Sequence, residues 1–512
     1  MWTDGYFMEG TYTYGYYREL SPAWQRYCLL ANGYEAPAPG PDAVHCELGF
    51  GQGVSVNIHA AAEPGRFIGT DFNPSHAMHA NLLCKASGAD ATLWDLSFAE
   101  LLGRDDIPML DSISMHGVWT WISRENQNMV LEFVRRYLKP GGIFYNSYNC
   151  FPGWALHHPV RDLLTMPDIY ARQRTGAAER VSDALAFAEK AVRANPVYAE
   201  RNQPILKRLE ELKKQNPSYL AHEFLNRDWI VMYFTEVAEL LKNAKLSYAC
   251  TATLLDTLDD VESMNMPEEA RAFLETVQHP LMREGLRDYY INRQFRKDLY
   301  LKGKRGMTPQ RQNEALLAVK YLLVAADPGK LEMSGYYRKI DFKPELLNPI
   351  YSWLKADRSR PRSFTEFTRH HPDFSPIVLA SLLKVMVELN IIVPCQPEEA
   401  AQAAAPYCER LNRYLCRRAL QTEEIAYLAS PVTGFAMALG RIPQMFLHFL
   451  WEGKKPAVLA KEVWNVLQSQ GQYLIVEGKR LETEKENLDE LKQQAKTFTD
   501  KTLPLLKALG VY

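Results

Sequence analysis

Three glycines stand at every second position in the stretch VHCELGFGQGVSVNI, residues 44–58. Gly49, Gly51 and Gly53 follow an apolar segment that ends in the acid Glu47. Glycine loses more conformational entropy on folding than any other residue, so three in five positions indicate unusual backbone dihedrals or a close ligand. Asp71 ends the next apolar segment, and a carboxylate there can accept hydrogen bonds from both hydroxyls of a ribose. The glycines and Asp71 together predict a nucleoside site.

The spacing of the glycines indicates which nucleoside they fit. The dinucleotide fingerprint is GxGxxG, with its third glycine three residues after the second, and here Val56 stands three residues after Gly53. The pattern ExGxGxG instead resembles motif I of the class I S-adenosylmethionine-dependent methyltransferases. A nicotinamide site is the less favoured alternative, and a tight structural turn would need only one or two of the glycines.

The resemblance implies S-adenosylmethionine as the cofactor, with the glycines around its methionine part and Asp71 on its ribose. Trp94 and Asp95 end the third predicted strand and would lie beside the adenine, where a ring can stack and an acid can accept from the exocyclic amine. A plain core role for Trp94 is the alternative. The expected cofactor-binding residues are Glu47, Gly49, Gly51, Gly53, Asp71, Phe72, Trp94, Asp95 and His116.

Short apolar runs alternate with helical stretches between residue 43 and about residue 150. This alternation is typical of βαβ units and predicts an α/β fold with a Rossmann-like, doubly wound parallel sheet. Asn73 is the expected N-cap of a helix with Pro74 at its first position, and the last helix of the unit is expected to stop at Pro140, Gly141 and Gly142. The predicted strands are AVHCEL, RFIGTD, ATLWDL, DSISMH and GIFYNSY.

After residue 154 the sequence pattern changes to that of long charged helices, which indicates a helical insertion or a dimerisation arm. The segment from SFTEFTRHHPDF to IIVPC has a helix-turn-helix-strand rhythm that suggests a winged helix, and the Ala-rich stretch 396–406 reads as a linker. The helix 375–390 has one Lys and a long apolar face, so we expect it to pack against another domain instead of reading DNA. The predicted regions are an N-terminal lid segment (1–40), a cofactor-binding core (41–165), a helical insertion with a regulatory region (166–305), a winged-helix-like domain (306–396) and a C-terminal helical domain (407–512).

A wider resemblance rests on TYGYYRELSPAW (13–24), MHGVWTWIS (115–123), YNSYNCFPGW (145–154), AHEFLNRDWIVMYF (221–234) and RDYYINRQFRKDLYLKGK (287–304). These stretches resemble bacterial protein-lysine methyltransferases that carry a methyltransferase regulatory domain, a group that includes enzymes acting on outer-membrane proteins. The resemblance implies lysine N-methylation of a protein, a lid before the sheet and a homodimer. Aromatic walls suit an amine acceptor, and the expected acceptor-side residues are His116, Trp121, Tyr148 and Tyr16. His116 as a structural residue is an equal alternative.

Composition excludes several classes of protein. The net charge of −2 gives no strong field for nucleic acid, and no run of about eighteen apolar residues predicts membrane insertion. The eight cysteines form no CxxC pair, which favours free thiols in the cytoplasm. The sequence HEFLN has Asn226 where a zinc-binding HExxH helix needs its second histidine, so we expect no metal.

Three rival functions stay open on the sequence alone. The acceptor can be a small metabolite or a peptide natural product, the cofactor can be a nicotinamide, or the chain can be a non-catalytic cofactor sensor.

Overall fold

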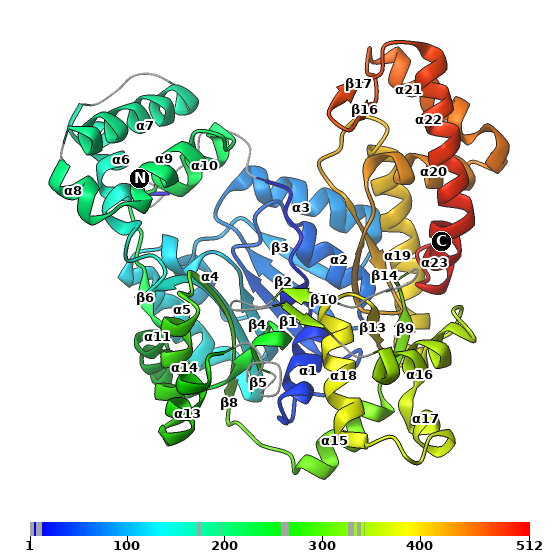
Figure 1. The fold of residues 1–512 in the computed structure, drawn as a ribbon, viewed down its shortest axis with the longest axis horizontal. Coiled ribbons are helices and arrows are strands. Elements are labelled where there is room, and N and C mark those ends of the chain that lie inside the picture. The colour runs from blue at the N-terminus through cyan, green and yellow to red at the C-terminus, as the bar shows by residue number, and fades with distance from the viewer. Residues whose placement is uncertain are drawn as a thin grey trace.

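Eight strands of the described residues form one sheet in the order β3-β2-β1-β4-β5-β8-β7, with β6 pairing alongside β5 (Figure 1). The computed structural model describes residues 5–6, 13–171, 176–194, 196–257, 266–325, 332–334, 339–341 and 344–512. The first five strands run parallel, which confirms the predicted doubly wound fold. The strands are β1 (Val44–Leu48), β2 (Arg66–Thr70), β3 (Ala91–Trp94), β4 (Leu110–Met115), β5 (Leu138–Phe151), β6 (Met232–Tyr233), β7 (Leu246–Thr251) and β8 (Phe295–Lys302).

Helices cover both faces of this sheet. Hydrophobic side chains of α1, α2 and α3 pack on the face that carries Tyr145, and those of α4, α5 and α11 pack on the face that carries Phe144. Asn73 caps α3 as predicted, because its side chain accepts from the Ser75 N–H at 3.0 Å. The helices are α1 (Pro22–Ala31), α2 (Val54–Ala62), α3 (Pro74–Ser87), α4 (Phe98–Leu102), α5 (Arg124–Tyr137) and α11 (Phe234–Leu241).

The end of α5 differs from the prediction. The helix stops at Tyr137, and Pro140, Gly141 and Gly142 belong to β5 instead. Leu138 pairs with Leu110 of β4, with an irregularity in register before Ser112 meets Ile143. The helix therefore ends three residues before Pro140, because the chain begins to pair with β4 at Leu138.

Strand β8 runs antiparallel between β5 and β7. It comes from the C-terminal end of the predicted regulatory region and lies next to β5 in the sheet. Two further helices of this region are α13 (Glu268–Thr276) and α14 (Pro280–Tyr290).

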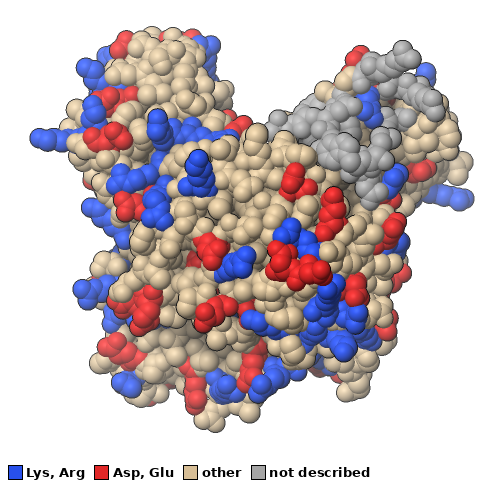
Figure 2. All heavy atoms as spheres, turned by 180° about the vertical axis from the view of Figure 1, so that it is seen from behind, with Lys and Arg blue, Asp and Glu red and all other residues tan. Residues whose placement is uncertain are grey.

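The predicted helical insertion forms a helical lobe with its own hydrophobic cluster. This lobe and the C-terminal helices stand apart at the upper edge of the molecule in Figure 1, and Figure 2 shows the notch between them from behind. Basic and acidic side chains intermix over the face in Figure 2. The lobe consists of α6 (His158–Ala171), α7 (Ala177–Arg193), α8 (Pro196–Arg201), α9 (Pro204–Leu212) and α10 (Pro217–Phe224).

The winged-helix prediction is not confirmed. Strand β13 follows α18 as expected, but a second wing strand does not come next in the chain, which enters α19 at Glu398, while β13 pairs back to β9. The apolar face of α18 is buried as predicted, with Leu379, Leu383 and Met386 in the core. The elements are α15 (Pro309–Ala318), β9 (Lys320–Leu323), β10 (Glu332–Ser334), β11 (Lys339–Asp341), α16 (Pro344–Lys355), β12 (Arg362–Ser363), α17 (Phe364–His370), α18 (Pro376–Glu388) and β13 (Ile392–Cys395).

The linker prediction for residues 396–406 is wrong, because the long helix α19 begins at Glu398 and includes most of them. Alanine has the highest helix propensity, and Glu398 and Glu399 favour the positive N-terminal end of the helix. One hydrophobic cluster runs from α1 through the α18 region to the last helices, so the C-terminal half packs directly on the sheet domain. The remaining elements are α19 (Glu398–Arg418), β14 (Tyr427–Ser430), β15 (Phe435–Ala438), α20 (Arg441–Trp451), α21 (Leu459–Ser469), β16 (Ile475–Val476), β17 (Lys479–Arg480), α22 (Glu484–Thr497) and α23 (Leu503–Ala508).

Candidate active site

The glycine loop, residues 49–53, needs glycine for conformation and for space. Gly49, Gly51 and Gly53 have φ values of 72°, 56° and 72°, in the left-handed region that L side chains rarely adopt. A Cβ on Gly53 would lie 2.3 Å from the Cβ of Ala80 in α3, and one on Gly49 would lie 2.6 Å from Cγ2 of Val118. The loop therefore turns tightly at the carboxyl end of β1, as the spacing predicts.

Asp71 ties this loop to the start of α3. Its Oδ2 accepts from the Gly51 N–H at 2.8 Å, and its Oδ1 accepts from the Asn73 N–H at 3.0 Å. His76 Nδ1 lies 3.1 Å from the same Oδ1. A carboxylate offers about four acceptor positions, so Asp71 can hold the loop and still receive a ligand hydroxyl. His76 was not among the predicted site residues, although its place one turn after the Asn73 cap is a sequence signal for this contact.

Glu47 is a buried acid on the same side of the cavity. Its side chain belongs to the next-to-last residue of β1 and is only 7% exposed. Burial, and then the nearby charge of Asp71, raise the pKa of Glu47 to about 8. A cation bound beside it would favour the ionised form.

A cavity of about 440 Å³ joins these groups to the helical lobe. Gly53, Trp94, Asp95 and Tyr16 are not among its lining residues, although all four are expected at the site. The predicted residues that do line it are Glu47, Gly49, Gly51, Asp71, Phe72, His116, Trp121 and Tyr148.

Trp94 and Asp95, which are expected beside the adenine, do not line this cavity. Trp94 packs under the guanidinium of Arg104, 4.7 Å from its ring centroid, and Asp95 is exposed. Leu96, Ser97 and Phe98 line the cavity instead. Thr70 holds this segment, because its hydroxyl bonds both the carbonyl and the N–H of Leu96. The capping box of Ser97 and Glu100 is the sequence signal for this turn.

His116 sits between aromatic rings at the carboxyl end of β4. Its Nδ1 lies 2.8 Å from the hydroxyl of Tyr145, and its ring stacks on Tyr17 with centroids 3.9 Å apart. Burial lowers the pKa of His116 to about 4, against a smaller opposing effect of Glu19. The imidazole is therefore neutral at pH 7 and is a weak base.

Tyr17, and not Tyr16, brings the N-terminal segment to the cavity. The hydroxyl of Tyr16 accepts from the Ala436 N–H at 2.8 Å and contacts His59 Nε2 at 3.1 Å, so packing turns this side chain toward α2 and β15. The backbone N–H of Tyr17 donates to Ser55 Oγ at 3.0 Å, and the Tyr17 ring lies over His116.

Tryptophans and an acid form the end of the cavity near the helical lobe. Trp121 and Trp154 line it and both contact the ring of Trp229, with centroids 6.3 and 5.3 Å away. Glu223 of α10 lines the same end, and its charge contributes to raising the pKa of Tyr17. Trp154, Glu223 and the role of α10 were not predicted, because nothing in the local pattern shows that the helical lobe reaches this cavity.

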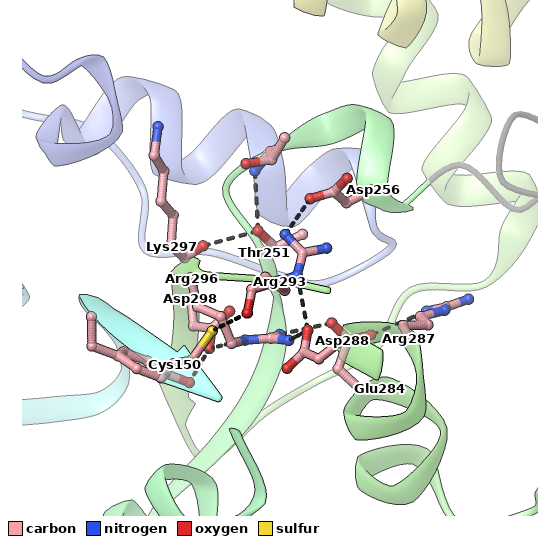
Figure 3. A network of polar contacts seen from close by, with 12 residues as sticks. Cys150, Thr251, Asp256, Glu284, Arg287, Asp288, Arg293, Arg296, Lys297 and Asp298 are labelled. Atoms are coloured by element: carbon pink, nitrogen blue, oxygen red, sulfur yellow. Dashed lines mark hydrogen bonds and ion pairs between the residues drawn. The ribbon is translucent and has the colours of Figure 1, made fainter. Parts of the chain in front are cut away.

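Tyr148 contributes to the cavity wall while its hydroxyl is held in the core. The hydroxyl donates to Asp298 of β8 at 2.6 Å. Asp298 also pairs with Arg296 at 2.8 Å, in the buried network that Figure 3 shows. Arg296 is 1% exposed and pairs with Glu284 at 2.7 Å and Asp288 at 2.6 Å. The wall at Tyr148 is therefore fixed by residues far along the chain.

The part of the chain that the structure describes shows neither a metal-binding cluster nor a membrane-spanning helix. Within it, no cluster of three or more His, Cys, Asp or Glu side chains is arranged to hold a metal ion. Within the same residues, no helix has the length and apolarity to span a membrane.

Residues 216–302 match the model of a predicted methyltransferase regulatory domain. The chain is 35% identical to the uncharacterised protein sll1526 of Synechocystis sp. over 100% of this chain and 99% of that protein. It is 26% identical to the uncharacterised protein RP789 of Rickettsia prowazekii, over 49% of this chain and 45% of that one. The structure of PKMT2 from Rickettsia typhi in complex with AdoHcy superposes with a TM-score of 0.71 at 16% identity, covering 97% of this chain and 99% of that one. That likeness shows a shared fold over nearly the whole of both chains.

Proposed function

The chain belongs, with sll1526, to a family of class I methyltransferase-fold proteins that carry a methyltransferase regulatory domain, and we propose that it is an S-adenosylmethionine-dependent methyltransferase that N-methylates lysine side chains of a protein. One observation carries the proposal. A single cavity joins the glycine loop and Asp71 to a wall of tryptophans with Glu223 at the lobe end.

The first half of the cavity suits S-adenosylmethionine. The glycine loop takes the methionine part, and Asp71 accepts from a ribose hydroxyl at the acceptor position that its other contacts leave. The carboxylate of Glu47, when ionised, favours a positive charge beside it. The complex of Rickettsia typhi PKMT2 with AdoHcy supports this choice of cofactor.

The second half suits an amine. Trp121, Trp154 and Tyr17 give apolar and aromatic walls, and Glu223 gives a negative charge for an arriving ammonium. The amine must be neutral before it attacks, and a lysine has an ordinary pKa near 10.4, so desolvation between aromatic walls raises the reactive fraction.

The transfer is an in-line displacement. The nitrogen lone pair forms a bond to the methyl carbon as the carbon–sulfur bond breaks, and S-adenosylhomocysteine leaves with the electron pair. His116, with its pKa near 4, is too weak a base to take the proton from lysine, so the proton passes to water before transfer and His116 orients the amine.

The test uses methyl-labelled S-adenosylmethionine, the pure protein and heated lysate of its host. Label that enters acid-precipitable protein and is recovered as methyl-lysine after acid hydrolysis supports the proposal. Label found only in small molecules moves the acceptor to a metabolite, and tight cofactor binding without transfer indicates a sensor.

Glu223→Gln tests the acceptor end separately. We expect the KM for the protein acceptor to rise about fivefold to tenfold, because a partly buried charge pair is lost, while the Kd for S-adenosylmethionine stays unchanged. Glu210→Gln on the exposed side of α9 is the matched control. An unchanged KM in Glu223→Gln would remove this residue from acceptor binding.

We also keep two proposals that the family resemblance implies. The first is a homodimer, to be measured by light scattering, and exposed apolar side chains on the helical lobe such as Tyr170 and Ile169 are compatible with it. The second is a cytoplasmic location, with which the eight free cysteines agree.

A further inference from the structure

His79 and Arg418 form a hydrogen-bonded chain that ends on the glycine loop. The Nδ1 of His79 lies 2.7 Å from the carbonyl oxygen of Gln52, between Gly51 and Gly53. The Nη1 of Arg418 lies 2.9 Å from Nε2 of the same ring. A carbonyl oxygen can only accept and a guanidinium can only donate, so Nδ1 carries the proton and Nε2 accepts. The two contacts together require a neutral imidazole in one tautomer.

The contact fixes a peptide plane of the loop. The carbonyl of Gln52 is held by His79, and the N–H of Gly53 on the same peptide group donates to the Phe50 carbonyl at 2.9 Å. The neighbouring Gly51 N–H is held by Asp71. A five-residue loop with three glycines gains little rigidity from its own side chains. The contacts with His79 and Asp71 therefore decide its shape.

Arg418 belongs to the last turn of α19, 339 residues from His79 along the chain. Glu424 accepts from its Nη2 at 2.7 Å, and its guanidinium carbon lies 5.3 Å from the ring centroid of Tyr14. The same helix reaches α3 through Arg410, whose Nε donates to the Ser87 carbonyl at 2.7 Å. The C-terminal region is therefore anchored on α3, the helix whose His79 contacts the glycine loop.

We infer that Arg418 and His79 are positioning residues for the cofactor, through which the C-terminal region holds the glycine loop in its binding shape. The inference rests on the proposed cofactor. It assigns to α19 an indirect part in the cofactor site, because this helix contributes no lining residue to the cavity and acts through His79.

The hydrogen-bonded chain of Gln52, His79 and Arg418 also makes cofactor binding sensitive to acid. Burial lowers the pKa of His79 and the Arg418 charge lowers it further, while the Gln52 carbonyl and Glu424 act in the opposite direction. The groups that face His79 are Arg418, Glu424, His76 and Tyr14. Protonation turns Nε2 into a donor opposite the guanidinium, so the contact breaks as the pH falls below the pKa of His79.

The experiment measures the Kd of S-adenosylmethionine by calorimetry, together with the melting temperature without cofactor. We expect Arg418→Gln and His79→Ala each to raise the Kd about tenfold, and the double variant to be no weaker than the worse single one, because both act through one chain. Arg418→Lys should recover part of the affinity, since an ammonium can still donate to Nε2. Arg413→Gln is the matched control, because Arg413 lies on the same helix and pairs with Glu409 at the surface.

A pH series separates positioning from general packing. Wild-type affinity should fall on acidification, and His79→Ala should lose this part of the pH dependence. Arg418→Gln with a lower melting temperature but an unchanged Kd would overturn the inference while leaving the proposed function intact. A wild-type protein that binds no S-adenosylmethionine would overturn both.

Discussion

The carboxylate of Asp71 accepts a hydrogen bond from the backbone N–H of Gly51 at 2.8 Å. The acid at the end of β2 thus holds the loop at the end of β1 as well as facing the cavity. The proposed ribose contact and the shape of the loop therefore depend on the same side chain.

Asp71→Ala should abolish measurable cofactor binding. The substitution removes the ribose acceptor and the loop contact, each a hydrogen bond to a charged group worth about 1.5–3 kcal/mol, so we expect the Kd to rise at least about 100-fold. Asp95→Asn is the matched control, since Asp95 follows the neighbouring strand and is exposed. Calorimetry that finds equal losses for both would refute the ribose assignment.

Affinity for S-adenosylmethionine should rise with pH up to about pH 8. Glu47 has a raised pKa of about 8 in the described structure, so it is mostly protonated at pH 7. The cationic cofactor favours the ionised form, so binding releases a proton below pH 8 and tightens by at most about tenfold per pH unit. Titrations in buffers of different ionisation enthalpy measure this proton. Glu47→Gln should flatten the profile, and a flat wild-type profile would contradict the assignment.

His116→Gln should lower turnover about tenfold without changing the shape of the pH profile. Its pKa of about 4 keeps the imidazole neutral throughout the working range, so the acid limb reports deprotonation of the acceptor amine. Tyr145→Phe removes the partner of Nδ1 and should share part of the loss. Disappearance of the acid limb in His116→Gln would instead identify His116 as the base.

Asp298→Ala should cost about 3–5 kcal/mol of the free energy of unfolding, because Arg296 would keep its charge in the core with one counterion fewer. Glu409→Ala, which breaks an exposed pair with Arg413, should cost less than about 0.5 kcal/mol. Urea unfolding of the two variants measures the difference. Equal midpoints would show that the buried network does not support the sheet.

The spacing of residues along the sequence determined those parts of the protein that depend on a single stretch of chain. The glycine loop, the acid Asp71, the Asn73 cap and the parallel strands follow from residue types and their periods, because those set backbone dihedrals and the buried face of each element. The apolar face of α18 was likewise predictable as buried.

Only the tertiary structure decided which neighbouring side chains reach the site. Tyr16 and Tyr17 are adjacent and alike in sequence, yet His59 and Ala436 hold one away from the cavity while Ser55 holds the other over His116. The insertion of β8 beside β5 and the reach of Arg418 to His79 join segments that are distant along the chain. Such contacts depend on packing between distant elements, and no local period records which of them will meet.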